Sequence, residues 1–450
     1  MTQTLPLTHF EELMLHQDSA AYPVSCFLRL NFEGTLQKEA FLQATKSAVQ
    51  RHPLLASTIV FGRRPTWQLP SADHEPEIHW STSDEPLRAC RQDPSRAAAL
   101  TLHVSVVESR STVLVQFHHA CCDGIGIFQF IRDLLVEYAD AVAGKFPNVA
   151  EDPGVIDLLK RREAFGYPLR QLVRLTVQQA ARLPSVWNFF RRSPVALIPH
   201  RPRPAEADVP SGFPGICSHQ FDVETSSAIR AAVPDGGALN DVLMTNLFLA
   251  IRDFRMQYSF ASESDWVRLM IPTSLRLKDH YRISAANILG MVFVERSGRQ
   301  LRDPDELLTG IRAEMDFIKR LKLGYLFVMS LMLGRRLPGG LRYMAAQNQG
   351  RISAVFTNIG RILNRCPLPK QQDGLLQSGN VLLRSVETCA PVGRDVCAAF
   401  SAVWYANRLS LTLHYDPGAM TDQHARRLLQ LFVGRTQNIL PHQPVPVSTR

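Results

Sequence analysis

The stretch FHHACCDGIG, residues 117–126, places two adjacent histidines ahead of an Asp-Gly pair, where an expected strand gives way to an expected helix. Three kinds of site would use these residue types. They are a metal centre, a cysteine nucleophile activated by histidine, and a histidine base supported by an aspartate. The rest of the chain has to separate these three interpretations.

The metal and cysteine interpretations are the weaker ones. His118 and His119 end a strand, where successive side chains point to opposite faces of the sheet, so only one of them faces a given site. The chain has no His-Glu-x-x-His or Cys-x-x-Cys cluster to complete a metal site. Cys121 and Cys122 are expected to be buried packing residues, because free cysteine is among the most buried residue types. The pattern therefore favours His119 as a general base, with Asp123 at the start of the next helix.

The composition is that of a soluble globular protein. The chain has 450 residues, of which 45% are hydrophobic and 20% charged, and this length favours two domains. Its eight cysteines are scattered, which predicts neither a disulfide framework nor a zinc ribbon. The first residues lack the pattern of a secretory signal, and no apolar run is long enough to span a bilayer. We expect a cytoplasmic location, with contact at the inner membrane surface as a further expectation.

The net charge of +9 is concentrated in one segment. Lys160–Arg203 contains ten basic residues and a single acidic one, Glu163, so it carries the whole net charge of the chain. Such a local excess predicts one anionic partner or surface: a membrane, the acidic helix of a carrier protein or the phosphates of coenzyme A. The alternative is a solvated crossover whose arginines face water. The location of the charge argues against a nucleic-acid-binding protein. The apolar residues interleaved with the arginines are typical of an interfacial helix.

Strands and helices alternate in both halves of the chain. Strands are expected at 24–34 and 265–276, amphipathic helices at 36–52 and 124–144, and a strand, a turn and a closing helix at 407–440. A further helix is expected at 238–254 with Asn240 as its N-cap. This order predicts an α+β protein of two domains. We place the domains at 1–205, which includes the basic crossover, and at 206–450.

The motif HHACCDG resembles the His-His-x-x-x-Asp-Gly signature of the condensation-domain and chloramphenicol-acetyltransferase-like acyltransferase superfamily. Weaker similarities follow in the family's order along nearly the whole chain: RHPLLAS at 51–57, ALNDVLMTNLFLAIR at 238–252, IPTSLR at 271–276, NILGMVF at 287–293, FTNIG at 356–360 and LSLTLHYD at 409–416. The Asp-Phe-Gly-Trp-Gly motif of the plant branch is absent from the sequence. The chain is therefore most similar to the stand-alone bacterial members.

The resemblance implies a fold and an activity. The fold would be two acetyltransferase-like lobes arranged as a V, with the active site in a tunnel between them. The activity would be transfer of an acyl group from acyl-CoA or an acyl-carrier protein to a hydroxyl or amine, without a further cofactor or a metal. His119 would be the base, and Asp123 would pair with an arginine of the second half, for which Arg276 is the candidate. The alternative is a catalytically silent member that binds acyl chains or a carrier protein.

Three more residues would support the site. Gly124 permits close backbone approach at the helix start, and its N–H is a candidate donor to an oxyanion. His118 is expected to brace the loop. Asn358, in the FTNIG segment, is expected to support the site because of the resemblance of that segment.

Overall fold

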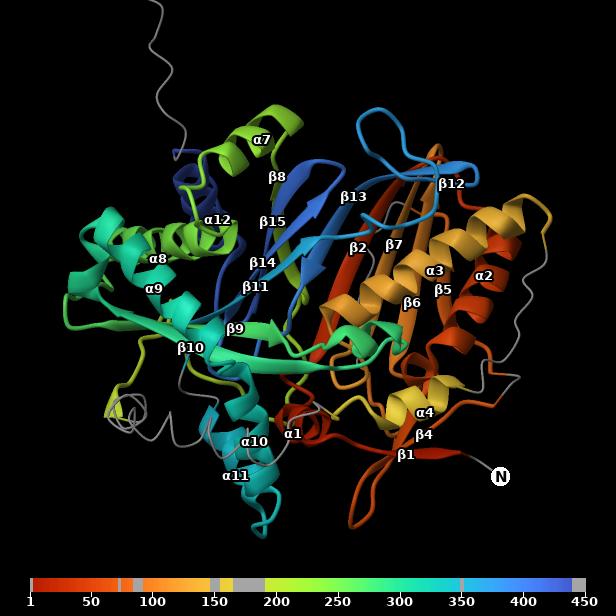
Figure 1. The fold of residues 1–450 in the computed structure, drawn as a ribbon, viewed down its shortest axis with the longest axis horizontal. Coiled ribbons are helices and arrows are strands. Elements are labelled where there is room, and N and C mark those ends of the chain that lie inside the picture. Colours follow the sequence, from red (N-terminus) through yellow and green to blue (C-terminus); the bar gives the residue numbers. More distant parts are fainter. Residues whose placement is uncertain are drawn as a thin grey trace, which may run out of the picture.

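The computed structural model describes residues 3–71, 74–83, 92–145, 154–164, 191–348 and 352–438. Two six-stranded sheets form its frame (Figure 1). The first sheet has the order β12 (Gln377–Ser378), β13 (Val381–Cys389), β2 (Ser25–Glu33), β7 (Arg110–His118), β6 (Leu100–Val107) and β5 (Glu77–Ser81). The second has the order β10 (Leu289–Ser297), β9 (Trp266–Ser274), β11 (Ala354–Arg361), β14 (Ala398–Tyr405), β15 (Arg408–Tyr415) and β8 (Gly215–Gln220).

Both sheets are mixed. Their pairs are antiparallel except for β5 with β6 in the first sheet, and β11 with both β9 and β14 in the second. A small third sheet is formed by β1 (Thr4–Pro6), β4 (Thr66–Gln68) and β3 (Thr58–Val60). The predicted α+β class is therefore confirmed.

Helices cover the sheets in two groups. Packed on the first sheet are α2 (Lys38–Arg51) and α3 (Gly124–Val142), and on the second sheet α8 (Leu239–Gln257), α9 (Pro304–Arg320) and α12 (Asp422–Gln437) (Figure 1). A third group contains α1 (His9–Gln17), α10 (Gly324–Gly334) and α11 (Gly340–Asn348). The other helices of the described residues are α4 (Gly154–Lys160), α7 (Val223–Ala231) and the short 3-10 segments Pro53–Ala56, Lys278–Arg282 and Gly298–Leu301.

Most of the expected helices and strands lie where the apolar pattern places them. The residue that caps α8, however, is not the expected one. The helix begins at Leu239, so Asn240 is inside its first turn and not at the N-cap. The Asp241 carboxylate accepts a weak hydrogen bond of 3.4 Å from the Ala238 N–H instead. The prediction that Asn240 caps this helix is wrong, because the carboxylate of Asp241 reaches back over the helix start.

A strand from late in the chain completes the first sheet. β13 pairs with β2 along its length, and β12 extends the same edge. The side chains of Val381, Leu383 and Val386 consequently belong to the hydrophobic core of the first sheet. The strands that follow, β14 and β15, return to the second sheet and its own core. The division into units 1–205 and 206–450 stays a prediction. β12 and β13 belong to the second of these units by sequence but to the first sheet by pairing.

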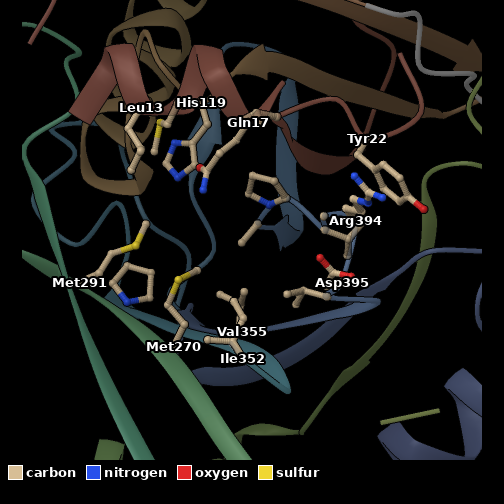
Figure 2. Close-up of a pocket in the computed structure, with 18 of the residues that line it drawn as sticks. Leu13, Gln17, Tyr22, His119, Met270, Met291, Ile352, Val355, Arg394 and Asp395 are labelled. Atoms are coloured by element: carbon tan, nitrogen blue, oxygen red, sulfur yellow. The ribbon is translucent and has the colours of Figure 1, made fainter. Parts of the chain in front are cut away.

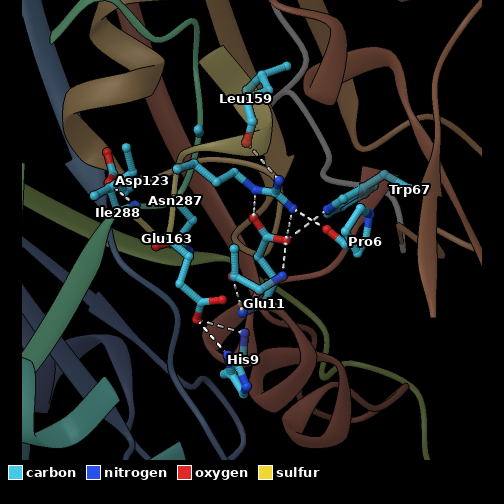
Figure 3. Close-up of polar contacts among 12 residues, drawn as sticks. Pro6, His9, Glu11, Trp67, Asp123, Leu159, Glu163, Asn287 and Ile288 are labelled. Carbon is cyan, nitrogen blue, oxygen red and sulfur yellow. Dashed lines mark hydrogen bonds and ion pairs between the residues drawn. The ribbon is translucent and has the colours of Figure 1, made fainter. Parts of the chain in front are cut away.

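A buried ion pair fixes the helix α1 to the segment that follows α4 (Figure 3). The Arg162 Nε lies 2.7 Å from Glu11 Oε1, and both side chains are at most 2% exposed. The Glu11 carboxylate also accepts hydrogen bonds from the Thr8 N–H at 2.9 Å and from the Trp67 Nε1–H at 3.0 Å. Burial of this charge is tolerable because its oxygens are saturated with donors.

The segment Lys160–Arg203, predicted to contact an anionic surface, is described only at 160–164 and 191–203. Residues 165–190, including most of its apolar stretches, lie outside the described residues. Three of its described arginines form internal ion pairs. Arg162 pairs with Glu11, Arg192 with Glu295, and Arg203 with Asp416. Charges used in this way connect the crossover to the two halves and are not available to a partner, so the predicted anionic contact gains no support from them.

In the described part of the chain, no helix combines the length and apolarity that crossing a membrane requires.

Candidate active site

The site is built where β7 ends in the middle of the first sheet. His118 is the last residue of the strand, and the His119 N–H donates to the carbonyl of Val24 at 2.8 Å. The chain then turns, and α3 begins at Gly124. As the alternation of a strand predicts, the two histidines separate. His118 is fully buried, and His119 is half-buried and faces a cavity (Figure 2).

The ring of His119 is held in one tautomer. Its Nδ1 lies 2.9 Å from the carbonyl oxygen of Cys122, and a carbonyl only accepts hydrogen bonds, so Nδ1 carries the proton. Burial lowers the pKa of His119, which keeps the ring neutral near pH 7. The Nε2 atom is then an unprotonated acceptor. This is the state that a general base requires.

His118 braces the turn from the other side. Its Nδ1 accepts a hydrogen bond of 3.2 Å from the Ala120 N–H, so Nε2 carries the proton. That Nε2 points toward Asp18 Oδ1, at 3.6 Å. Asp18 in turn accepts a hydrogen bond from the Val24 N–H, so one carboxylate lies between the end of β7 and the residue that precedes β2.

Asp123 is the N-cap of α3 and is completely buried. Its Oδ1 accepts from the N–H groups of Ile125 and Gly126, at 3.0 and 2.9 Å. Its Oδ2 accepts from the Ile288 N–H at 2.8 Å and from Arg276 Nη1 at 2.6 Å. The predicted pairing of Asp123 with Arg276 is thus present in the structure. The carboxylate does not line the cavity, and its geometry is that of a residue that holds the loop.

The segment 285–288, which leads into β10, is held at two more points, one on the β7–α3 turn and one on His52 at the end of α2. The Asn287 Nδ2 donates to the carbonyl of His119 at 2.8 Å, and the Ala285 N–H donates to His52 Nδ1 at 2.8 Å. The opposite nitrogen of His52 lies 3.1 Å from Asp133 on α3. Sequence reasoning missed His52 and Asn287 as parts of the site, although both lie in segments that carried the resemblance.

The other two predicted residues, Gly124 and Asn358, are not among those that line the cavity. Gly124 is next to β11, and a Cβ atom built on it would lie 3.3 Å from the terminal methyl of Ile359, so the approach is close but could be relieved by a small shift of that side chain. No hydrogen bond to the Gly124 N–H is present within the described residues. Asn358 Oδ1 accepts from the Gly360 N–H at 3.0 Å in the bulge of β11. Asn358 is not among the residues that line the cavity, and its supporting role stays a prediction.

The two cysteines of the motif are packing residues. Cys121 and Cys122 are completely buried, and burial raises the pKa of both thiols well above its usual range. A thiol in this state is a poor nucleophile. Within the described residues there is also no cluster of three or more His, Cys, Asp or Glu side chains that could hold a metal ion.

The cavity in front of His119 has apolar walls supplied by the second sheet, by residues that flank strands of the first sheet, and by α1 and α10 (Figure 2). Leu289, Met291 and Phe293 alternate along β10 and present one face of that strand to it. Gln17, at the end of α1, lies beside the His119 ring. The walls are formed by Leu13, Met14, Val24, Met270, Pro272, Leu289, Met291, Phe293, Phe327, Ile352, Val355, Ala390, Pro391, Val392 and Val396.

The opposite end of the cavity is polar. Tyr22, Arg394 and Asp395 gather there, across the cavity from His119 (Figure 2). Burial raises the pKa of the Asp395 carboxyl. The site therefore combines one basic nitrogen, a long apolar lining and a polar end, which suits a substrate with an apolar chain and a polar group.

Comparison with known sequences gives distant relatives. No protein-family model matches the chain. An uncharacterized protein present in two strains of Mycobacterium tuberculosis is 27% identical over 301 residues, which are 61% of this chain and 63% of the relative. The match thus spans less than two thirds of that relative's length.

Solved structures match over nearly the whole chain, at low identity. The trichothecene 15-O-acetyltransferase of Fusarium sporotrichioides matches with a TM-score of 0.71 and 12% identity, over 97% of this chain and 96% of that one. The starter condensation domain of rhizomide synthetase, in complex with C8-CoA, gives 0.67 and 14%, over 97% and 95%. Polyketide synthase associated protein 5 of Mycobacterium tuberculosis gives 0.64 and 15%, over 97% and 98%.

These matches test the fold that the motif implied. The arrangement of the lobes as a V and the tunnel between them stay predictions. The extent of the matches, over both sheets and their helices, shows that the chain has the fold of the condensation-domain and chloramphenicol-acetyltransferase-like acyltransferase superfamily.

Proposed function

We propose that this protein is an acyltransferase that moves an acyl group from a thioester, acyl-CoA or an acyl-carrier protein, to a hydroxyl or amine acceptor. The observation that carries the proposal is the state of His119. Its Nδ1–H is held by the Cys122 carbonyl, its lowered pKa keeps it neutral, and it faces an apolar cavity. A neutral imidazole with a free Nε2 in such a place is equipped for proton transfer.

The reaction would proceed by direct attack. The Nε2 of His119 takes the proton of the acceptor O–H or N–H while the acceptor oxygen or nitrogen bonds to the thioester carbonyl carbon. The carbonyl electron pair moves to oxygen and forms a tetrahedral oxyanion. When the oxyanion collapses, the C–S bond breaks, and the leaving thiolate takes the proton from Nε2. No acyl-enzyme forms, so both substrates must be bound together.

Other groups of the site would position this chemistry. The Gly124 N–H is the candidate donor to the oxyanion, at the N-terminus of α3, where the helix favours negative charge. Asp123, Arg276 and Asn287 would keep the β7–α3 turn in place and would not touch the substrate. The apolar walls would accept the acyl chain or an apolar acceptor.

Two of the structural matches agree with this reaction. One is named as an acetyltransferase, and another was solved with C8-CoA. Their low identity to this chain supports the general class of reaction and leaves the substrates open. Because the substrates are open, the proposal includes an acyl-carrier protein as well as coenzyme A as the thioester donor.

The test is turnover of acyl thioesters. The purified protein is incubated with acetyl-CoA, octanoyl-CoA or an acylated carrier protein and a panel of alcohols and amines, and free thiol and acylated product are measured. His119→Ala is expected to lose ~10² or more in turnover, and the matched control His79→Ala, an exposed histidine on β5, to keep it. Tight binding of acyl thioesters without any turnover by the parent would instead identify a catalytically silent binding protein.

A further inference from the structure

A second basic region lies far from the crossover. Residues 317–372 contain ten basic side chains and no acidic one. In the middle of this stretch, α10 and α11 form a hairpin that projects from the body of the molecule (Figure 1). The basic residues of the stretch are Lys319, Arg320, Lys322, Arg335, Arg336, Arg342, Arg351, Arg361, Arg365 and Lys370.

The hairpin exposes apolar side chains at its tip. One side of α10, with Tyr325, Val328 and Leu331, is buried against α1 and β10. Where a helix of a soluble protein usually presents polar residues to water, the tip presents a cluster of large apolar ones. These are Met332, Leu333, Leu337 and Tyr343, of which the last three are each more than 60% exposed.

Two arginines accompany this apolar cluster. Arg336 and Arg342 are exposed and form no ion pair within the described part of the chain. Their neighbour Arg335 differs, because it is paired with Glu12 at 2.9 Å. The tip thus combines exposed apolar surface with uncompensated positive charge.

A second tip repeats the combination. The turn between β3 and β4 exposes Val60 and Phe61, at 45% and 64%, next to the exposed Arg63 and Arg64. No ion pair of these two arginines is present among the described residues. The β3–β4 turn and the α10–α11 hairpin project at the same edge of the molecule (Figure 1).

We propose that this edge docks on an anionic phospholipid bilayer. Leucine, methionine and aromatic side chains insert into the headgroup boundary, and arginines near the surface gain from the negative potential of anionic lipids. Two separate protrusions suit a lipid surface, which accepts each one independently. An acidic protein helix would need a continuous groove. The docking edge is distinct from the crossover Lys160–Arg203, where Arg162, Arg192 and Arg203 are paired within the chain.

The hairpin also connects this edge to the cavity. Phe327, on α10, lines the cavity, and Leu333 follows it six residues later, which is about 9 Å along a helix. Docking would therefore bring the cavity wall close to the lipid. The docking proposal does not depend on the chemistry proposed for His119.

The experiment is flotation of the full chain with vesicles of phosphatidylcholine, with or without phosphatidylglycerol. The parent is expected to float with the anionic vesicles, and less so as salt increases. Leu333→Asp with Leu337→Asp, Arg336→Glu with Arg342→Glu, and Phe61→Asp with Arg64→Glu are each expected to weaken this binding about tenfold or more. The matched control, Met256→Asp with Arg230→Glu, changes equally exposed residues elsewhere and should bind like the parent.

Because all these side chains are exposed, the variants should fold, and thermal melting verifies this. Turnover of a short soluble thioester should be the same in the tip variants and the parent, so loss of docking is distinguishable from loss of the proposed chemistry. A parent that ignores phosphatidylglycerol vesicles, or tip variants that bind them undiminished, would overturn the proposal. So would tip variants that still bind vesicles but fail with an acylated carrier protein, because the edge would then be a protein-docking surface.

Discussion

The Nη1 atom of Arg276 lies 2.6 Å from Oδ2 of Asp123, and both side chains are at most 1% exposed. The other oxygen of Asp123 caps α3, while Arg276 also donates to the carbonyl of Ala286 at 3.0 Å. One carboxylate thereby joins the start of α3 in the first half to the β9–β10 segment of the second half. The turn that carries His119 ends at this carboxylate.

Removing this carboxylate should destabilise the fold. Asp123→Ala leaves the Arg276 cation buried without its partner and removes the helix cap, so we expect a loss of about 3–5 kcal/mol in the free energy of unfolding. Asp123→Asn keeps an acceptor oxygen for the cap but turns an NH2 donor toward Arg276 and the Ile288 N–H, so we expect a smaller loss that comes mainly from the broken pair. Denaturant unfolding followed by circular dichroism measures both.

A double-mutant cycle separates the pair from the cap. Asp123→Asn combined with Arg276→Met removes both charges and should be less destabilised than the sum of the single variants. If Asp123→Ala unfolds like the parent and keeps full activity, the buried pair does not support the site.

The pH dependence of turnover reports the state of His119. Burial lowers the pKa of His119 from its ordinary value of 6.5, and the base acts only when unprotonated. Activity is therefore present above the lowered pKa and lost as the pH falls through it, so the acid limb of kcat/KM should have its midpoint below 6.5. Between pH 6.5 and the lowered pKa, the folded state binds fewer protons than the unfolded one, so the fold loses stability as the pH falls through this range. Melting curves must therefore accompany the rates. An acid midpoint at or above 6.5 would be inconsistent with a base buried as His119 is.

The cysteines of the motif should be dispensable for chemistry. Cys121→Ala and Cys122→Ala remove thiols whose raised pKa makes them inert, so both variants should keep turnover within a few fold. Iodoacetamide should likewise leave the folded parent active. A folded but inactive cysteine variant would require a covalent mechanism in place of direct attack.

The sequence predicted the local part of the site because local rules govern it. Alternation along β7 separates His118 from His119, and the Asp-Gly pair marks the start of α3. The partner of Asp123 is different. Residue 276 lies 153 positions away, and only the resemblance to a family suggested it.

The remaining contacts depend on tertiary structure that no local pattern contains. Asn287 reaches the His119 carbonyl, and Ala285 reaches His52, only because the β9–β10 segment crosses to the first sheet. The pairing of β13 with β2 is equally non-local. Three arginines of Lys160–Arg203 likewise meet counter-charges, such as Glu11 and Asp416, that lie far away in the sequence.

The cavity walls should limit the length of the acyl chain. Met291 lies in the middle of the row of β10 side chains that faces the cavity. A tryptophan ring at this position would fill part of the cavity. Met291→Trp should therefore reduce kcat/KM for a dodecanoyl donor about tenfold more than for an acetyl donor, because a misfitted chain costs binding free energy in proportion to its buried length. Steady-state rates with the two donors measure this ratio, and Met256→Trp, at an exposed site, is the matched control. Equal losses with both donors, or losses that follow the size of the acceptor, would show that these walls do not bind the acyl chain.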